Sequence, residues 1–574
     1  MTTTGRAPFG TNVSASSPAM NAACELLDSL VSLGVRHVVL SPGSRSQALA
    51  LAAADLERQG RISLHVRIDE RVAGFMALGI GRETRVPAAV ICTSGTAVAN
   101  LLPATLEAFH SGVPLLLLTA DRPLELRGVG ANQATDQPGI FGDSVRLAVD
   151  APTPDSESDV GDMVRLAARA FVAAAGESVQ GPVHLNLPFR EPLGGAIPEW
   201  FASGGRGSGE PVRQARQLIP EMPEPVTVAP GPRTVVVAGA DAGSDAEVIA
   251  HQGRWPLIAE VVSGARFGRR VVNGYREALR DLDLGGRIER VIVVGHPTLA
   301  RETAALLSNP DVEIIAVRGT GEPLNLNGKT VHADAVAVGA GEPDREWNSA
   351  WSRFSRAHTV DLDTSAPDLD GLQSTDPKTR LGAVRAELDA VRTPLDRVQL
   401  VAGVWRATWP HDRLMFASSR LVRVADEVLG GKRIPVHANR GLAGIDGTIA
   451  TGLGIALAAR ATGDVGVTRI LTGDLAFLHD VGALLIPAGE SATRVQVVVG
   501  NDGGGTIFDG LEVAKSAGDD AMRRVQYTPQ SADLAALASA YGWEHVTATT
   551  RAQLDEALTS VMTAPRIIEV PLTR

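Results

Sequence analysis

The chain has 574 residues, of which 44% are hydrophobic and 21% are charged. This composition is typical of a folded chain of roughly three or four domains and excludes a protein that is disordered as a whole. The 65 acidic and 54 basic residues give a formal net charge of −11, which argues against nucleic acid or an anionic membrane as the main partner.

The sequence also bears on the compartment. Its two cysteines, Cys24 and Cys92, are too few for a disulfide framework and show no zinc-ligand spacing. No apolar run approaches the roughly 20 residues that a spanning helix needs. The first twenty residues lack the apolar core of a signal peptide. We therefore expect a cytoplasmic protein without a membrane span, beginning with a flexible tail over residues 1–20.

In the first third of the chain, short apolar runs alternate with helical patterns. An amphipathic stretch over 21–33 ends at Gly34, a residue suited to the C-terminal end of a helix. Apolar runs without alternation, which fit strands buried on both faces, follow at 35–40, 62–66, 88–92, 114–119 and 183–187. Strands with helical patterns between them predict a parallel sheet.

The same pattern occurs twice more. A stretch rich in Pro, Gly and Ser over 188–232 is interpreted as a linker, and a second polar stretch covers 361–379. Strands are predicted at 234–238, 256–261, 291–295 and 312–317, and then at 414–417, 434–438, 468–472, 495–499 and 567–570. We expect an α/β chain of three domains, each built on a mainly parallel sheet flanked by helices, over 21–195, 215–360 and 390–574.

One glycine-rich turn in the middle third suggests a dinucleotide site only superficially. The run over 235–238 leads into Gly239-Ala240-Asp241-Ala242-Gly243, which lacks the G-x-G-x-x-G spacing. An ordinary turn between strand and helix is favoured there.

The strongest chemical signal lies over 468–508. Asp474 and Asp502, 28 positions apart, each follow the end of a predicted strand, and Asp502 leads into three glycines. Ligands bind at this edge of open α/β sheets. Magnesium takes carboxylate and phosphate oxygens, and glycines let the backbone approach a diphosphate. The competing interpretation is that both are ordinary turn sequences.

This arrangement resembles the metal–diphosphate motif of thiamine diphosphate-dependent enzymes. Within that superfamily the closer similarity is to the carboligases of menaquinone biosynthesis that join 2-oxoglutarate to isochorismate. The matching segments are 41–45, 69–71, 93–100, 119–123, 130–133, 439–441, 444–447 and 504–508. The resemblance implies the thiamine diphosphate-binding fold, with a pyrimidine-binding domain over 21–195, a middle domain and a diphosphate-binding domain over 390–574.

The resemblance also implies roles for individual residues. Glu70 would be the catalytic carboxyl group at the pyrimidine ring of the cofactor; without the resemblance, a helix-start carboxylate or a partner of Arg67 or Arg71 is favoured. The metal ligands (Mg²⁺ or Mn²⁺) would be Asp474, Asp502 and the Gly504 carbonyl, with Asn501 as the alternative if the register is off by one. Cofactor contacts would come from Gly473, Leu475, Ala476, Ile445, Ile507, Phe508 and Leu511.

Both implied substrates are dicarboxylic, and arginine is the residue best suited to bind carboxylates. The matching positions are Ser44, Arg45, Arg122, Asn132, Gln133, Arg301, Ser419, Arg423 and Arg440. For any single arginine, a solvated ion pair is the default interpretation.

The implied activity is that of a transferase working as a homodimer or tetramer with shared active sites. Another thiamine diphosphate-dependent 2-oxo acid decarboxylase, or an acetolactate-type synthase, is the alternative. A catalytically silent protein of the same fold is a third possibility, although keeping Glu70, Asp474 and Asp502 together argues against it.

Overall fold

The computed structural model describes residues 16–157, 160–176, 179–205, 225–317, 319, 321–362, 367–490 and 493–574. Residues 1–15 of the expected tail lie outside these ranges. The last residues of that tail are helical instead, because α1 (Pro18–Leu33) begins with Pro18, and the Ser17 side chain accepts a hydrogen bond from the Met20 backbone.

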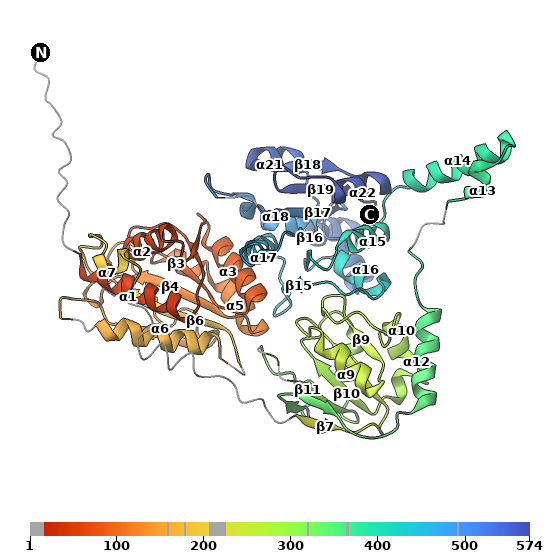
Figure 1. Ribbon diagram of the computed structural model, residues 1–574, viewed down its shortest axis with the longest axis horizontal. Helices are drawn as coiled ribbons and strands as arrows, with labels where there is room; N and C mark the ends of the chain where they lie inside the picture. The colour runs from red at the N-terminus through yellow and green to blue at the C-terminus, as the bar shows by residue number, and fades with distance from the viewer. Residues whose placement is uncertain are drawn as a thin grey trace, which may run out of the picture.

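Three groups of strands and helices follow one another along the chain (Figure 1). The first sheet has six parallel strands in the order β2-β1-β3-β4-β6-β5. Its strands are β1 (His37–Leu40), β2 (Ser63–Val66), β3 (Ala88–Cys92), β4 (Leu115–Asp121), β5 (Leu147–Asp150) and β6 (Pro182–Pro188). Its helices are α1, α2 (Gln47–Arg58), α3 (Glu70–Thr84), α4 (Thr96–Ala99), α5 (Leu102–Ser111), α6 (Val160–Ala174) and α7 (Glu199–Ala202).

The middle group carries a five-stranded parallel sheet in the order β12-β11-β10-β8-β9 and a two-stranded sheet of β13 and β7. Its strands are β7 (Val226–Val228), β8 (Thr234–Ala238), β9 (Leu257–Ala259), β10 (Arg290–Val294), β11 (Glu313–Val317), β12 (Val331–Ala333) and β13 (Val336–Val338). Its helices are α9 (Asp245–Gly253), α10 (Tyr275–Arg280), α11 (Arg301–Leu307) and α12 (Arg345–Ala357).

The third sheet again has six parallel strands, in the order β15-β14-β16-β17-β19-β18. They are β14 (Arg413–Phe416), β15 (Val436–Ala438), β16 (Thr468–Gly473), β17 (Val495–Asn501), β18 (Glu544–Thr547) and β19 (Arg566–Pro571). The helices are α13 (Leu369–Gln373), α14 (Pro377–Arg392), α15 (Arg397–Ala407), α16 (Arg420–Val428), α17 (Thr448–Ala461), α18 (Asp474–His479), α19 (Val513–Ser516), α20 (Asp519–Met522), α21 (Leu534–Tyr541) and α22 (Arg551–Thr559). Short turns of helix cover 124–126, 285–287, 481–484, 506–510 and 523–527.

The first and third sheets share one topology. Counting strands within each group, both have the order 2-1-3-4-6-5. The predicted fold class is thereby confirmed, with parallel sheets flanked by helices. Two interpretations of linkers were wrong in detail: α7 and β7 lie inside 188–232, and α13 and the start of α14 lie inside 361–379.

Helices α3 and α17 join the first and third groups (Figure 1). Phe75 and Met76 of α3 share one buried apolar core with Ile449 and Leu453 of α17. Close approach depends on glycine, since a Cβ at Gly454 would lie 2.1 Å from the Met76 carbonyl oxygen. Within the part of the chain that the structure describes, no helix combines the length and apolar character needed to cross a bilayer.

Candidate active site

The predicted metal ligands lie together at the carboxyl ends of two neighbouring strands. Strands β16 and β17 pair in parallel with Gly473 opposite Gly500, so Asp474 and Asp502 follow adjacent strand ends. Asp474 is 5% exposed, and its Oδ2 accepts a hydrogen bond of 2.7 Å from the Gly504 backbone. The structure therefore places Asp474, Asp502 and Gly504 at one edge of the third sheet.

The electrostatics of this pair favour a cation. Burial raises the pKa of Asp474, and the nearby Asp502 carboxylate raises it further. Asp502 forms an ion pair with Arg397, with an Nη2–Oδ2 distance of 2.8 Å, and accepts a hydrogen bond of 2.5 Å from the Thr506 hydroxyl. The described residues contain no group of three His, Cys, Asp or Glu side chains suited to a metal. A cation here would thus need backbone and diphosphate oxygens in addition.

The glycines after Asp502 are required by the path of the backbone. Gly504 has a φ of 131°, and a Cβ there would lie 2.2 Å from the Tyr527 carbonyl oxygen. A Cβ at Gly505 would lie 2.6 Å from the Gln526 carbonyl oxygen. The loop therefore packs against the backbone of Gln526 and Tyr527 on a path that no larger residue could follow.

Most of the predicted cofactor contacts lie in the two segments that follow β16 and β17. Gly473 is the N-terminal cap of α18, and Leu475 and Ala476 lie in its first turn, where backbone N–H groups suit an anion. Ile507 and Phe508 are half-buried in the helical turn over 506–510, and Leu511 follows it. Ile445 lies in the loop before α17 and is 39% exposed.

Several arginines gather where the middle group meets this edge. Arg440 is buried; its Nε donates 2.8 Å to the Thr298 hydroxyl and its Nη2 donates 3.2 Å to the Thr298 carbonyl. Burial lowers the pKa of Arg423, and the nearby Arg276 and Arg301 lower it further. Cations close enough to lower one another's pKa favour an anionic ligand between them.

Two other predicted residues have local partners. Ser419 caps α16, and a Cβ at Gly473 would lie 3.4 Å from the Ser419 Cβ, so the Ser419 side chain lies beside Gly473. Arg301 forms an exposed ion pair of 2.8 Å with Glu512.

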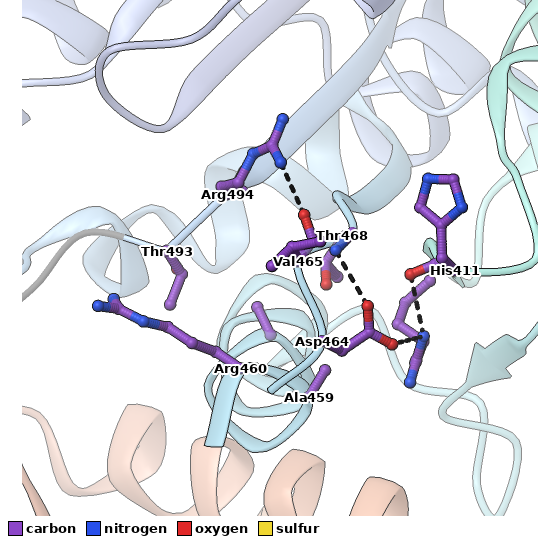
Figure 2. A pocket seen from close by; sticks show the side chains of 11 residues that line it. His411, Ala459, Arg460, Asp464, Val465, Thr468, Thr493 and Arg494 are labelled. Carbon is purple, nitrogen blue, oxygen red and sulfur yellow. Dashed lines mark hydrogen bonds and ion pairs between the residues drawn. The ribbon is translucent and has the colours of Figure 1, made fainter. Parts of the chain in front are cut away.

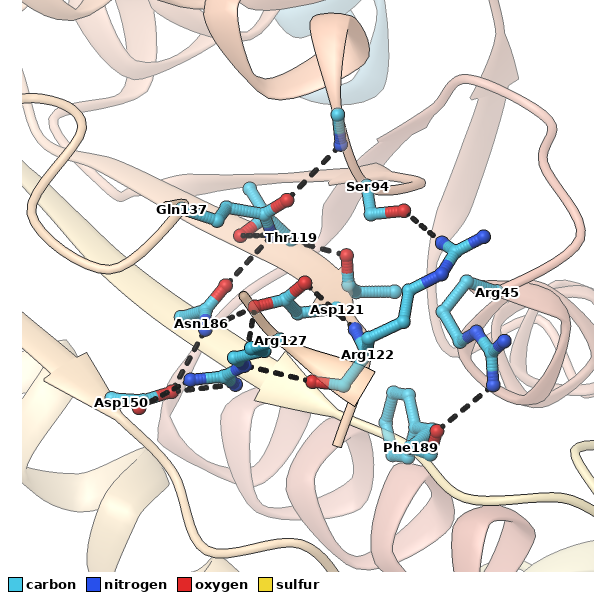
Figure 3. A network of polar contacts seen from close by, with 12 residues as sticks. Arg45, Ser94, Thr119, Asp121, Arg122, Arg127, Gln137, Asp150, Asn186 and Phe189 are labelled. Atoms are coloured by element: carbon cyan, nitrogen blue, oxygen red, sulfur yellow. Dashed lines mark hydrogen bonds and ion pairs between the residues drawn. The ribbon is translucent and has the colours of Figure 1, made fainter. Parts of the chain in front are cut away.

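Of the remaining predicted substrate residues, Arg45 and Arg122 follow the carboxyl ends of β1 and β4 in the first sheet (Figure 3). Ser44, Asn132 and Gln133 lie in the segments after these strands. Arg122 is buried and donates to the Ser94 hydroxyl, and Gln133 donates 2.9 Å to the Ser94 carbonyl. Burial lowers the pKa of Arg122, and the nearby Arg45 lowers it further. Ser44 and Asn132 are exposed in the flanking loops. The structure thus groups Arg45, Arg122 and Gln133 around Ser94.

Glu70 lies near the Ser94 group: burial raises the pKa of the Cys92 thiol, two residues before Ser94, and the nearby Glu70 raises it further. Glu70 is the first residue of α3 and is half-buried. Arg67 pairs with Glu490 at 2.9 Å and Arg71 with Asp480 at 3.8 Å, so neither arginine is the partner of Glu70. Among the described residues, no hydrogen bond or ion pair joins Glu70 to Asp474 or Asp502.

Sequence reasoning missed residues that act through partners distant in the chain. Arg397 lies 105 positions from Asp502. Glu260 is fully buried, and its Oε1 accepts hydrogen bonds of 2.8 and 2.6 Å from the backbones of Thr298 and Leu299, in the segment that Arg440 contacts. Burial raises the pKa of Glu260 to about 8, with a contribution from Asp426. No local pattern marked either residue.

A cavity of about 280 Å³ lies elsewhere, near the amino ends of β14 and β16 (Figure 2). His411, Arg460 and Arg494 line it, and none of the predicted site residues does. It is therefore separate from the candidate active site.

Comparison with known proteins decides the family. Residues 20–140 match the model of the thiamine pyrophosphate enzyme N-terminal TPP binding domain, and residues 433–570 match the corresponding C-terminal domain. The chain is 52% identical to the 2-succinyl-5-enolpyruvyl-6-hydroxy-3-cyclohexene-1-carboxylate synthase of Leifsonia xyli subsp. xyli over 97% of both chains. The chain belongs to this synthase family.

Other comparisons agree. The synthase of Clavibacter michiganensis subsp. michiganensis is 51% identical over 100% of both chains. Benzoylformate decarboxylase from Polynucleobacter necessarius has the same fold, with a TM-score of 0.62 at 14% identity, covering 96% of this chain and 98% of that one. Membership of the synthase family confirms the predicted activity, a thiamine diphosphate-dependent transferase of menaquinone biosynthesis, over the decarboxylase and acetolactate-type alternatives.

Proposed function

We propose that this protein removes carbon dioxide from 2-oxoglutarate and adds the remaining succinyl unit to isochorismate. The product is 2-succinyl-5-enolpyruvyl-6-hydroxy-3-cyclohexene-1-carboxylate, as in the synthase family. One observation carries the proposal. Asp474 and Asp502 lie at the carboxyl ends of two adjacent strands, and arginines suited to dicarboxylic substrates lie nearby.

The residues present fit thiamine diphosphate. When bound, this cofactor supplies the thiazolium carbon at which a 2-oxo acid loses carbon dioxide and becomes an acyl carbanion equivalent. The glycine turn at Gly504 and the first turn of α18 would offer backbone groups to its diphosphate. Ile445, Ile507, Phe508 and Leu511 would provide apolar contacts to its rings.

A divalent ion, Mg²⁺ or Mn²⁺, completes this proposal. Asp474 and Asp502 would each offer a carboxylate oxygen, and Gly504 would offer its carbonyl. The support is electrostatic: burial raises the pKa of Asp474 and the nearby Asp502 carboxylate raises it further, and a cation bound to both would offset this repulsion.

Glu70 would hold a proton at the ring nitrogen of the cofactor's pyrimidine. Glu70 is half-buried, and the neighbouring Arg67 and Arg71 pair with Glu490 and Asp480, which leaves its carboxyl group for this role. Because Glu70 does not contact the Asp474 group within its own chain, we propose that it serves the site of a second copy. A homodimer, or a tetramer of two such dimers, would then contain complete sites.

The arginines divide between two half-sites under this proposal. Arg301, Arg423 and Arg440 would bind carboxylates beside Ser419, and Arg45 and Arg122 would do so beside Ser44, Asn132 and Gln133. Guanidinium groups lock the orientation of planar carboxylates through paired hydrogen bonds.

The proposed domains follow the sheets: a pyrimidine-binding domain over 21–195, a middle domain over 215–360 and a diphosphate-binding domain over 390–574. The first sheet spans 37–188, the strands of the middle group span 226–338, and the third sheet spans 413–571. The two buried unpaired cysteines are compatible with the cytoplasmic location that we propose.

The test incubates the protein with thiamine diphosphate, Mg²⁺, 2-oxoglutarate and isochorismate and identifies the product by mass spectrometry. We expect the adduct only when all components are present. Release of succinic semialdehyde with isochorismate left unchanged would contradict the proposal and indicate a simple decarboxylase.

A further inference from the structure

Arg397 is a cation placed where its own helix does not favour one. It is the first residue of α15, and positive charge at a helix N-terminus is destabilised by the helix dipole. Its side chain is 16% exposed, and its guanidinium lies 2.8 Å from Oδ2 of Asp502, whose side chain is 9% exposed. The position of Arg397 is thus explained by Asp502 and not by α15.

Arg397 also determines which oxygen of Asp502 is available. Oδ2 of Asp502 receives Nη2 and Nε of Arg397, at 2.8 and 3.3 Å, and the Thr506 hydroxyl at 2.5 Å. Among the described residues, no hydrogen bond to Oδ1 of Asp502 accompanies them. The carboxylate is therefore held by one oxygen and presents the other.

We propose that Arg397 is a positioning residue of the metal site. It offsets the charge of Asp502, so that Asp502 offers the metal an oxygen ligand while the Asp502–Arg397 pair has no net charge. Asp474 then contributes the uncompensated negative charge. This inference rests on the proposed metal site and adds a residue to it.

Charge balance predicts a distinctive pattern of metal affinities. Asp502→Asn leaves the Arg397 guanidinium unpaired beside a divalent cation, and we expect Mn²⁺ affinity to fall about tenfold or more. Arg397→Gln leaves Asp502 fully charged, and we expect affinity equal to or up to about tenfold above wild type. The double variant restores the net charge and should bind within about threefold of wild type.

The experiment titrates Mn²⁺ into the full-length protein with saturating thiamine diphosphate and measures the free ion by electron paramagnetic resonance. Circular dichroism of each variant without metal checks folding. Arg397→Lys keeps the charge, so it should bind like wild type and should fail to rescue Asp502→Asn. Arg397→Met is a second neutral replacement should the glutamine variant not fold. Arg406→Gln is the matched control, because Arg406 lies on the same helix and pairs with Asp555 at 2.6 Å.

Failure of the proposed metal site and failure of the inference about Arg397 give different results. If wild-type protein binds no Mn²⁺ saturably, the metal site itself is refuted, and the role of Arg397 with it. If wild type binds but the double variant is as weak as Asp502→Asn, or weaker, Arg397 does not balance Asp502 and only this inference is overturned. Weaker thiamine diphosphate binding by Arg397→Gln at saturating Mn²⁺, without rescue of Asp502→Asn, would likewise overturn it in favour of a phosphate contact.

Discussion

The crossing of α3 and α17 offers a direct test of how the first and third groups are joined. A Cβ at Gly454 would lie 2.1 Å from the Met76 carbonyl oxygen, and a Cβ at Gly79 would lie 2.1 Å from the Thr451 carbonyl oxygen. The close approach is thus made by glycine on both helices. Both obstructing atoms belong to the backbone, so no side-chain rotation can relieve the contact.

The variant Gly454→Ala should therefore be destabilised, although alanine is the better helix former. Real Cβ atoms essentially never approach closer than 3.0 Å, so the helices would have to separate by about 0.9 Å, the difference between 3.0 and 2.1 Å. Overpacking of a core costs about 1–3 kcal/mol and occasionally more. The higher helix propensity of alanine relative to glycine stabilises the variant by roughly 1 kcal/mol. With the contact against backbone on a rigid crossing, we expect a net loss of about 2 kcal/mol.

Thermal unfolding measures this loss. For a unit of 150–250 residues, about 2 kcal/mol lowers the Tm by roughly 4–8 °C. The control is Gly382→Ala in α14, where a Cβ would meet nothing within 4 Å, so the Tm should stay level or rise. A Gly454→Ala protein with a Tm at or above that of wild type would refute the close crossing.

Three further predictions concern the site and its surroundings. Glu70→Gln should still bind thiamine diphosphate but lose proton exchange at the thiazolium C2 about a hundredfold or more; hydrogen–deuterium exchange NMR at the wild-type rate would contradict this. Arg423→Ala should raise the KM for 2-oxoglutarate about tenfold by loss of a charge-assisted hydrogen bond, and unchanged kinetics would remove it from the site. Burial raises the pKa of Asp480 to about 7, so the folded state binds the proton more tightly than the unfolded state and stability falls as pH rises toward 7. Asp480→Asn removes this dependence, and its stability relative to wild type should rise by about 2 kcal/mol between about pH 5.5 and about pH 7.5 in urea unfolding; parallel curves for the two proteins would count against it.

Most of the strands predicted from sequence are buried on both faces, although the partly buried edge strands β2 and β15 were also predicted. β3 and β4 are wholly buried, so each is an uninterrupted apolar run. The edge strands β5 and β18 are only partly buried, and their mixed sequences gave no such run. Among the described residues, β7 pairs with β13 alone, and it begins with two exposed residues, which explains why its polar stretch did not indicate a strand.

The site divides in the same way. Asp474 and Asp502 could be predicted because each is fixed by a local feature, the end of a strand and the turn that follows it. Arg397 and Glu260 could not, because each acts on a segment brought to it by tertiary packing. A position in an apolar or helical run carries no information about a partner that only the fold supplies.

Exposed apolar side chains lie next to both half-sites, the one that contains Glu70 and the one that contains Asp474. Ile68, two residues before Glu70, is 74% exposed, and Val129 in the loop after Arg122 is 68% exposed. Beside the third sheet, Leu442 and Ile445 are 53% and 39% exposed. Apolar side chains around a polar site are typical of surfaces that a partner covers. In a dimer with two-fold symmetry, the apolar patch beside Glu70 in one copy would face the patch beside the third sheet of its partner, and the reverse. One interface would then bury both patches of each copy and complete two sites. The crossing of α3 and α17 holds the first and third groups in one arrangement within the chain, and in that arrangement Glu70 makes no hydrogen bond or ion pair with the Asp474 group among the described residues. We therefore expect the second copy to supply Glu70.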